Sequence, residues 1–186
     1  MNGISIIICC YNSISRLPET IKHIALQKIP SEIALELIVV DNNSSDDTAL
    51  VADLEVQQYH SLKENYSIVQ ESVPGLSNAR HKGIEVAKYE LIIFCDDDNW
   101  LEENYVFNAY TILSNDISIG ALCGQNNLMS NSTPAWFYRY ADAYAVGAPM
   151  LNSGEMSQRG WIWGAGMAIR RKLLLTFFDL GLYNLT

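Results

Sequence analysis

The sequence predicts an α/β fold with a mostly parallel central sheet flanked by helices, and three observations support this. From residue 4 to about 124, runs of β-branched residues alternate with amphipathic stretches, which is the pattern of βα units. The apolar runs, such as "ISIIICC" and "LELIVV", are far shorter than the roughly 20 residues that cross a bilayer. The 186 residues are 49% hydrophobic and 18% charged, which is ordinary for one globular domain.

The individual elements follow from this alternation. Pro18 stands where proline is tolerated, in the first turn of the first helix. Late in the chain, "GWIWGAGMAIRRKLLLTFF" predicts a short strand with Gly164 and Gly166, followed by a helix that carries the basic run Arg170–Lys172. The other strands are expected near residues 4–10, 34–40, 66–71, 90–95 and 119–124, and the helices near 14–28, 46–62, 76–88 and 100–114.

Charge and motifs exclude several classes of protein. The net charge of −9 argues against the broad electropositive face of a nucleic-acid-binding protein. No segment has the Gly-x-Gly-x-x-Gly pattern of dinucleotide sites or the Walker pattern of P-loop hydrolases. Cys9 and Cys10 point to opposite faces of a strand, and Cys95 and Cys123 stand alone. Buried reduced thiols are therefore expected, not disulfides or a zinc site.

The character of the chain changes near residue 125, where aromatic and small residues become frequent in "PAWFYRYADAYAVGAP". We expect one globular domain, made of an α/β half over residues 1–124 and a second region over 125–186. The chain reaches its first strand within a few residues, which leaves no room for a signal peptide and favours a cytoplasmic protein.

Three adjacent carboxylates in "IIFCDDDNW" follow the fourth strand directly. In an extended segment, Asp96 and Asp98 would face one side and Asp97 the other. Oxygen ligands at a strand end suit Mg²⁺ or Mn²⁺, shared with the phosphates of a substrate. The alternative is that Asp98 or Asn99 caps the next helix, with Glu102 completing a capping box.

Other polar segments also follow strands and should meet at the same edge of the sheet. "VVDNNSSDDT" places Asp41 and Asn42 where a base or ribose could bind, although an Asx-turn before a helix would explain the same residues. In "VPGLSNARHKGIEVA", Arg80 lies near a helix N-terminus, where a basic residue suggests a bound anion and a solvated face is the alternative. Trp161 and Trp163 beside Gly-x-Gly could stack on a sugar, or be core.

Together, five segments resemble the family 2 glycosyltransferases of the GT-A fold over nearly the whole chain. They are, in order, "SIIICCYN", "VVDNNSSDDT", "GLSNARHKGI", "IIFCDDDNW" and "WGAGMAIRR". The resemblance implies a Rossmann-like sheet, truncated at the C-terminus, that binds a nucleoside diphosphate sugar. The region from residue 125 would begin the side that faces the acceptor.

The resemblance also assigns roles to single residues. The family often has Thr or Pro at Cys9 and Asp at Asn42, so the base is left open, with uracil as the default. Asp98 matches the carboxylate that binds Mg²⁺ or Mn²⁺. The matched nucleotide-sugar-binding positions are Cys9, Tyr11, Asn12, Asp41, Asn42, Arg80, Asp96 and Asp97, and those beside the donor sugar and acceptor are Trp163, Gly164, Ala165 and Gly166.

The implied reaction transfers a sugar to an acceptor hydroxyl, with inversion at the anomeric carbon in most of the family. The family's general base belongs to a later acidic motif, expected beyond Thr186, and Asp179 does not match it. The resemblance therefore implies an N-terminal portion that binds donor but turns over poorly. By analogy, the acceptor is a glycan, a lipid-linked compound or another hydroxyl compound at the inner face of the membrane, in bacterial cell-envelope or polysaccharide assembly.

Two other functions stay open. A nucleotidyltransferase could use the same kind of sheet and carboxylates, but the glycine-rich basic loop usual after its first strand is missing, where "CCYNSISR" stands. A non-catalytic nucleotide-sugar-binding module is the other alternative, since no general base is assigned within the chain.

Overall fold

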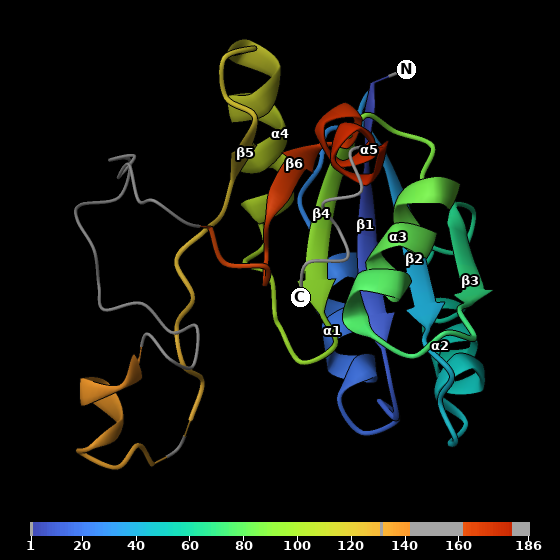
Figure 1. Cartoon of the computed structure of the whole chain (residues 1–186), viewed down its shortest axis with the longest axis vertical. Helices are drawn as coiled ribbons and strands as arrows, with labels where there is room; N and C mark the ends of the chain where they lie inside the picture. The colour runs from blue at the N-terminus through green and yellow to red at the C-terminus, as the bar shows by residue number, and fades with distance from the viewer. Residues whose placement is uncertain (1, 131, 142–161, 180–186) are drawn as a thin grey trace.

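The computed structural model describes residues 2–130, 132–141 and 162–179. Within them the chain forms a six-stranded sheet in the order β3-β2-β1-β4-β6-β5, with helices on both faces (Figure 1). The elements are β1 (Gly3–Cys10), α1 (Leu17–Ala25), β2 (Ala34–Asp41), α2 (Thr48–Val56), β3 (Tyr66–Gln70), α3 (Leu76–Val86), β4 (Leu91–Asp96), α4 (Tyr105–Asn115), β5 (Ala121–Leu122), the 3₁₀ helix η1 (Phe137–Arg139), β6 (Ala168–Arg170) and α5 (Arg171–Asp179).

The sheet is mostly parallel. β2 and β4 pair with β1 in parallel, and β3 pairs with β2 in the same way. β6 alone runs against its neighbours, antiparallel to β4 and to β5. The predicted α/β fold is therefore confirmed, and the carboxyl ends of β1 to β4 point to one edge.

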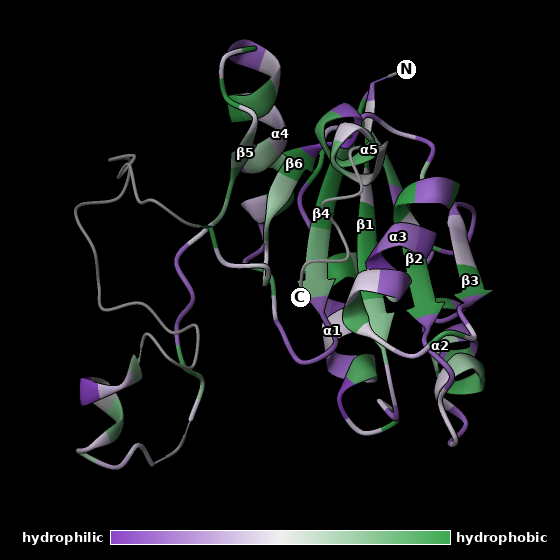
Figure 2. Ribbon diagram, in the orientation of Figure 1, coloured by the Kyte–Doolittle hydropathy of each residue, from purple (hydrophilic) through white to green (hydrophobic). Residues whose placement is uncertain are grey.

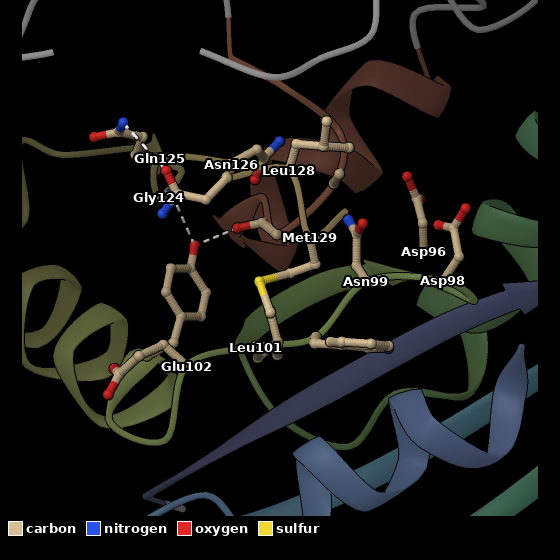
Figure 3. A pocket seen from close by; sticks show the side chains of 15 residues that line it. Asp96, Asp98, Asn99, Leu101, Glu102, Gly124, Gln125, Asn126, Leu128 and Met129 are labelled. Carbon is tan, nitrogen blue, oxygen red and sulfur yellow. Dashed lines mark hydrogen bonds between the residues drawn. The ribbon is translucent and has the colours of Figure 1, made fainter. Parts of the chain in front are cut away.

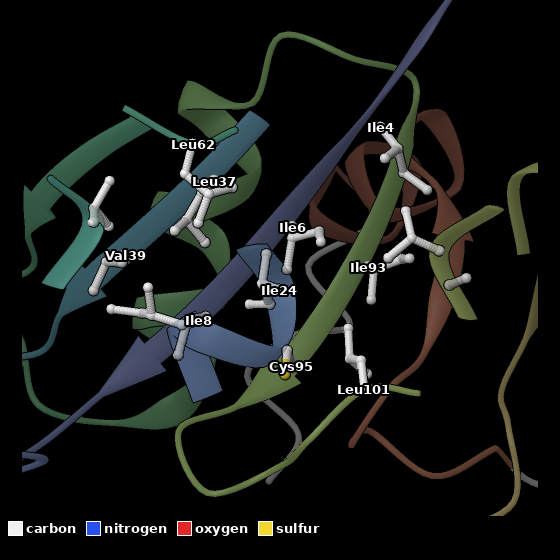
Figure 4. Packing of buried hydrophobic residues seen from close by; sticks show 14 of the residues in the cluster. Ile4, Ile6, Ile8, Ile24, Leu37, Val39, Leu62, Ile93, Cys95 and Leu101 are labelled. Carbon is white, nitrogen blue, oxygen red and sulfur yellow. The ribbon is translucent and has the colours of Figure 1, made fainter. Parts of the chain in front are cut away.

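Both faces of the sheet are covered, because the strands are apolar on both sides. Ile4, Ile6 and Ile8 of β1 pack in the larger core cluster with α1, α2 and α4, which Figure 4 shows in part. Ile7 points to the other face and packs in a second cluster with Ala79 and Ile84 of α3. Figure 2 shows the same division as hydrophobic strands between helices with polar outer surfaces. Such strands, buried on both faces, read as unbroken apolar runs.

Several predicted helices are shorter in the structure. α2 ends at Val56, not near residue 62, because the chain then turns through bonds such as the Leu62 N–H to the Tyr59 carbonyl. α4 begins at Tyr105 because the Gln27 side chain donates to the Leu101 and Glu102 carbonyls and so holds the preceding loop in place.

The prediction for Arg170 was wrong, because this residue ends strand β6 and does not belong to the helix. Its guanidinium is buried and donates to the backbone carbonyls of Leu113, Asp116 and Ile119. Gly164 and Gly166 precede β6 in a turn and are not part of the strand.

Two further expectations concern the thiols and the membrane. Cys10 and Cys95 are buried free thiols, as predicted, whereas the free thiols Cys9 and Cys123 are only partly buried. Across the described ranges, no helix combines the length and the apolar character needed to traverse a bilayer.

Candidate functional site

The carboxyl ends of β1, β2 and β4 meet at one edge of the sheet. The Asn12 N–H donates to the Ser44 hydroxyl at 3.0 Å, and the Asn12 side-chain oxygen accepts from the Ser45 N–H at 2.9 Å. The Ser13 hydroxyl donates to the Asp97 carboxylate, which joins the end of β1 to the end of β4. The polar segments that follow these three strands therefore form one surface.

The three adjacent aspartates divide into two groups. Asp96 and Asp98 both line a cavity, and Figure 3 shows them next to each other at one end of it. Asp97 is engaged elsewhere, since its carboxylate accepts from the Arg16 guanidinium at 2.6 Å. The expected separation of Asp97 from the other two is present, although residues 97 and 98 lie in a turn and not in an extended strand.

The capping alternative for these residues does not hold. The N-cap of α4 is Asn104, and neither Asp98 nor Asn99 contributes a cap. Glu102 instead accepts from the Asn104 N–H at 2.9 Å and from its side-chain amide. Within the described ranges, the Asp98 carboxylate makes no hydrogen bond or ion pair, so its oxygens face solvent and the cavity.

Asp96 lies in an environment that disfavours its negative charge. Burial raises the pKa of its carboxyl group, Arg80 opposes this, and the charges of Asp98 and Asp97 add to it. The Arg80 Nη2 atom is 4.0 Å from the Asp96 Oδ1 atom, too far for a close ion pair. A cation between Asp96 and Asp98 would relieve this repulsion.

The pair Asp41 and Asn42 is largely used to hold neighbouring loops. Asp41 accepts from the Ser44 N–H and from the Gln70 side chain. Asn42 donates both amide protons, to the Glu71 and Val73 carbonyls, and its oxygen accepts from the Gly75 N–H at 2.7 Å. A base could reach Asn42 only through the second lone pair of that oxygen.

Arg80 projects from α3 toward the end of β4. Its guanidinium carbon lies 5.2 Å from the centre of the Phe94 ring. A Cβ atom added at Gly164 would meet Arg80 Nη2 at 2.6 Å, so the glycine lets the turn before β6 approach the guanidinium. The structure thus brings together Arg80, Gly164 and Asp96, which were predicted from three separate segments.

Cys9 and Tyr11 lie at the end of β1. Burial raises the pKa of the Cys9 thiol to about 12, and Arg80 lowers it in part, so the thiol is protonated at neutral pH. Tyr11 is exposed. Cys9 can therefore serve as a weak hydrogen-bonding or packing group, but not as a thiolate nucleophile.

The cavity beside Asp96 and Asp98 has a volume of 630 Å³, within the range of about 300–1,000 Å³ found for small-molecule sites. Ala165 and Gly166 line it, but Gly164 and the half-buried Trp163 do not. Trp161 lies outside the described residues. The remaining lining residues are Asn99, Trp100, Leu101, Glu102, Tyr105, Gly124, Gln125, Asn126, Asn127, Leu128 and Met129.

Tyr105 fixes the far wall of this cavity. Its hydroxyl donates to the Gly166 carbonyl and accepts from the Gly124 N–H at 3.2 Å (Figure 3). Gly166 has a φ of +74°, which favours glycine, and its N–H donates to the Phe94 carbonyl at 2.9 Å. One tyrosine thereby ties α4, the segment after β5 and the turn before β6 together.

Sequence reasoning missed Tyr105, Trp100 and the segment from Gly124 to Met129. Trp100 gave one signal, because an aromatic residue directly follows the carboxylates in "DDDNW". Nothing in the sequence marked Tyr105 or residues 124–129. Residues 124–129 follow β5, which the antiparallel pairing of β6 with β4 and β5 brings to the site.

The carboxylates fit a metal that is shared with a substrate. No group of three or more His, Cys, Asp or Glu side chains able to hold a metal ion occurs in the described part of the chain. A cation coordinated by one or two carboxylates and by substrate phosphates needs no such group. Asp98 and Asp96, close together on one wall of the cavity, offer the hard oxygen ligands for it.

Known proteins resemble this chain in sequence and in fold. The family Glycosyl transferase family 2 matches residues 5–175. The poly-beta-1,6-N-acetyl-D-glucosamine synthase of Staphylococcus epidermidis is 26% identical over 133 residues, which are 72% of this chain and 31% of the synthase.

Two solved structures share the fold. TarS residues 1–349 from S. aureus, in complex with UDP, has a TM-score of 0.68 at 19% identity and matches 98% of this chain and 50% of its own. The mannosyltransferase PcManGT from Pyrobaculum calidifontis, in complex with GDP-Man and Mn²⁺, has a TM-score of 0.68 at 24% identity and matches 94% of this chain and 46% of its own. The chain thus spans about half the length of these structures. Given the match over residues 5–175, it belongs to glycosyl transferase family 2.

Proposed function

We propose that this chain binds a nucleoside diphosphate sugar with a divalent cation and takes part in transferring the sugar to an acceptor hydroxyl. The observation that carries the proposal is the placement of Asp96 and Asp98 on one wall of a cavity, with Arg80 at 4.0 Å from Asp96. Carboxylates for a cation and a guanidinium for phosphates are what a diphosphate needs in a protein of net charge −9.

The nucleoside would lie over the ends of β1 and β2. Cys9, Tyr11 and Asn12 would line the base, with Asp41 and the remaining lone pair of Asn42 beside it. Asp96 would face the ribose and diphosphate. Asp97 would act there indirectly, by holding Arg16 and the Ser13 loop.

Arg80 would stabilise the negative charge that develops on the departing diphosphate. Asp98 would provide oxygen ligands to the cation. When bound, Mg²⁺ or Mn²⁺ supplies positive charge that stabilises the leaving group. Preorganised groups of this kind contribute strongly, since removing one typically costs about 2.7–4 kcal/mol of transition-state stabilisation.

In the transfer itself, the acceptor oxygen forms a bond to the anomeric carbon as the bond to the diphosphate oxygen breaks, with inversion. The turn from Trp163 to Gly166 would face the sugar, and Ala165 and Gly166 are the part of it that lines the cavity. The hydroxyl proton goes to a general base, which we propose lies in sequence beyond Thr186. The chain by itself would then bind donor well and turn over slowly.

Uridine is the proposed nucleoside, supported by the UDP complex of TarS, while the GDP-Man complex of PcManGT makes guanosine the first alternative. The Staphylococcus synthase supports a role in bacterial cell-envelope polysaccharide assembly. Such a role would place the protein in the cytoplasm, at the inner face of the membrane, with a glycan or lipid-linked acceptor.

Calorimetric titration tests the proposal. UDP-sugars and GDP-mannose would be titrated into the protein with Mn²⁺ and again with a chelator. We expect metal-dependent binding of at least one donor, and a loss of roughly tenfold or more in affinity for Asp98→Ala. Glu64→Ala, which removes an exposed acid from the loop between α2 and β3, is the matched control and should bind normally. A folded protein that binds none of these donors would contradict the proposal.

The same preparation separates the nucleotidyltransferase alternative. That enzyme class would release pyrophosphate from a nucleoside triphosphate and a sugar phosphate, whereas the proposed activity releases a nucleoside diphosphate. Metal-dependent pyrophosphate release would favour the alternative. Donor binding without any product release, even when the complete protein is assayed, would favour the binding module.

A further inference from the structure

The cavity beside Asp96 and Asp98 is lined mainly by amide and apolar side chains. Four side-chain amides line it, from Asn99, Gln125, Asn126 and Asn127, together with Trp100 and the apolar Leu101, Leu128 and Met129. Figure 3 shows Asp96 and Asp98 at one end and Gln125 at the other. Amides that both donate and accept suit the hydroxyls of a sugar, and an aromatic face suits its C–H face.

Away from the donor carboxylates, the described lining of the cavity offers no cationic side chain to an anion. Among the residues that line it in the described chain, three are acidic and none is Lys, Arg or His. Of the cations near it, Arg16 is paired with Asp97 at 2.6 Å and Lys28 with Glu103 at 2.6 Å, while Arg80 lies at the donor end, 4.0 Å from Asp96. Away from the donor end, a phosphate or carboxylate on the ligand would meet Glu102 and no described side chain of opposite charge.

One face of the Trp100 ring is covered by a neighbouring aromatic ring. Its ring stacks on the ring of His23 from α1, with centroids 5.3 Å apart and planes within 4°. The Trp100 side chain is nevertheless 46% exposed and lines the cavity. Because His23 covers one face, the other face and the edges of the indole are the surface left for a ligand.

The end of the cavity away from Asp96 lies apart from the proposed nucleotide site. Cys9 and Asp41 lie on β1 and β2, on one side of β4, whereas the cavity extends to the other side, toward β6, β5 and α4. A donor that spans from β1 to Asp96 would place its diphosphate at the near end of the cavity, and the far end would stay open for a second molecule.

We infer that the cavity binds an uncharged sugar ring of the acceptor, stacked on Trp100, and that His23 is a positioning residue for this platform. The identification of this sugar as the acceptor rests on the proposed function. The preference for an uncharged ring over an anionic one is argued from the described lining of the cavity alone.

Saturation-transfer NMR tests the inference on the chain with UDP and Mn²⁺ present. The probes are methyl glycosides of glucose, galactose, mannose and N-acetylglucosamine, each beside its 6-phosphate. We expect at least one uncharged glycoside to bind, and its phosphate to bind more than about tenfold more weakly. Equal or tighter binding of the phosphates, or no signal from any glycoside, would overturn the inference.

Variants then locate the ring. Trp100→Ala should weaken glycoside binding by about tenfold, the order expected for one lost aromatic contact, with its folding checked by circular dichroism. Trp136→Ala removes an exposed tryptophan that does not line the cavity and is the matched control. His23→Ala should weaken binding and His23→Phe should restore it, because a flat ring can stack in the same place. A glycoside signal unchanged in Trp100→Ala contradicts the assignment.

Competition separates the acceptor from the sugar of the donor. Displacement of the glycoside by UDP-glucose, UDP-N-acetylglucosamine or GDP-mannose, but not by UDP, would show that the ring belongs to the donor and would overturn the inference. Failure of UDP and Mn²⁺ to bind would instead overturn the proposed function, and a glycoside signal without them would leave the sugar-binding cavity standing.

Discussion

At the scale of single residues, the surroundings of Asp96 disfavour its ionised form. Burial and the neighbouring aspartates raise its pKa, more than Arg80 lowers it. A raised pKa means that the stabilisation from this group is present below its ordinary value of 3.8 and is lost as the pH rises through the shifted value. At neutral pH, without a cation, the ionised carboxylate therefore costs stability.

Asp96→Asn should consequently increase the free energy of unfolding at pH 7 in the presence of a chelator. The gain should shrink as the pH is lowered toward the ordinary pKa, where the wild-type group is protonated. Urea unfolding at several pH values measures both effects. If the variant is less stable at pH 7, the attraction of Arg80 outweighs burial and the explanation is wrong.

Gly164 is a second residue whose size matters. In Gly164→Ala the new Cβ would meet the Arg80 guanidinium at 2.6 Å, and the flexible end of Arg80 can move away. We expect a stability change within about 1 kcal/mol and a fall of roughly tenfold in UDP affinity, since a charged contact to phosphate is displaced. Gly120→Ala, which meets the Leu173 side chain at 2.9 Å, is the control and should keep its UDP affinity. Equal affinity in both variants would show that Arg80 does not contact the nucleotide.

At the scale of elements, Arg170 joins β6 to the end of α4 and the loop that follows. Its buried guanidinium donates to three backbone carbonyls, those of Leu113, Asp116 and Ile119. Arg170→Met should lower the free energy of unfolding by on the order of 1–3 kcal/mol, because buried carbonyls lose their partners. Thermal unfolding measures this against Lys172→Met, which changes an exposed neighbour. Similar melting temperatures for the two variants would contradict the role.

The strand ends were predictable from sequence, and the far wall of the cavity was not. An apolar run predicts a parallel strand buried on both faces. The polar residues that follow such strands lie at the edge of the sheet where the carboxyl ends meet. "DNNSSDD" and "DDDN" could therefore be placed at the same edge of the sheet. Arg170, by contrast, looks like the start of a basic helix, because nothing local shows that carbonyls from α4 surround it.

At the scale of the whole molecule, the parallel half of the sheet and the family could both be predicted from the sequence. The division of residues 1–124 and 125–186 between donor and acceptor sides stays a prediction. Strand β6, antiparallel to both of its neighbours in the described sheet, brings the turn at Gly166 against Phe94 and Tyr105, from far apart in the sequence. Contacts of such long range follow from packing, which periodicity does not encode.

In the proposed site, Asp98 holds a cation beside Asp96 together with a diphosphate, so the cation and the diphosphate should each strengthen the binding of the other. Water-proton relaxation with Mn²⁺ measures the metal affinity with and without UDP, and calorimetry measures UDP affinity with and without Mn²⁺. Thermodynamic linkage requires the two factors to be equal, and we predict roughly tenfold or more for each. Mn²⁺ binding that UDP does not change, or UDP binding as tight in a chelator as in Mn²⁺, would contradict the claim.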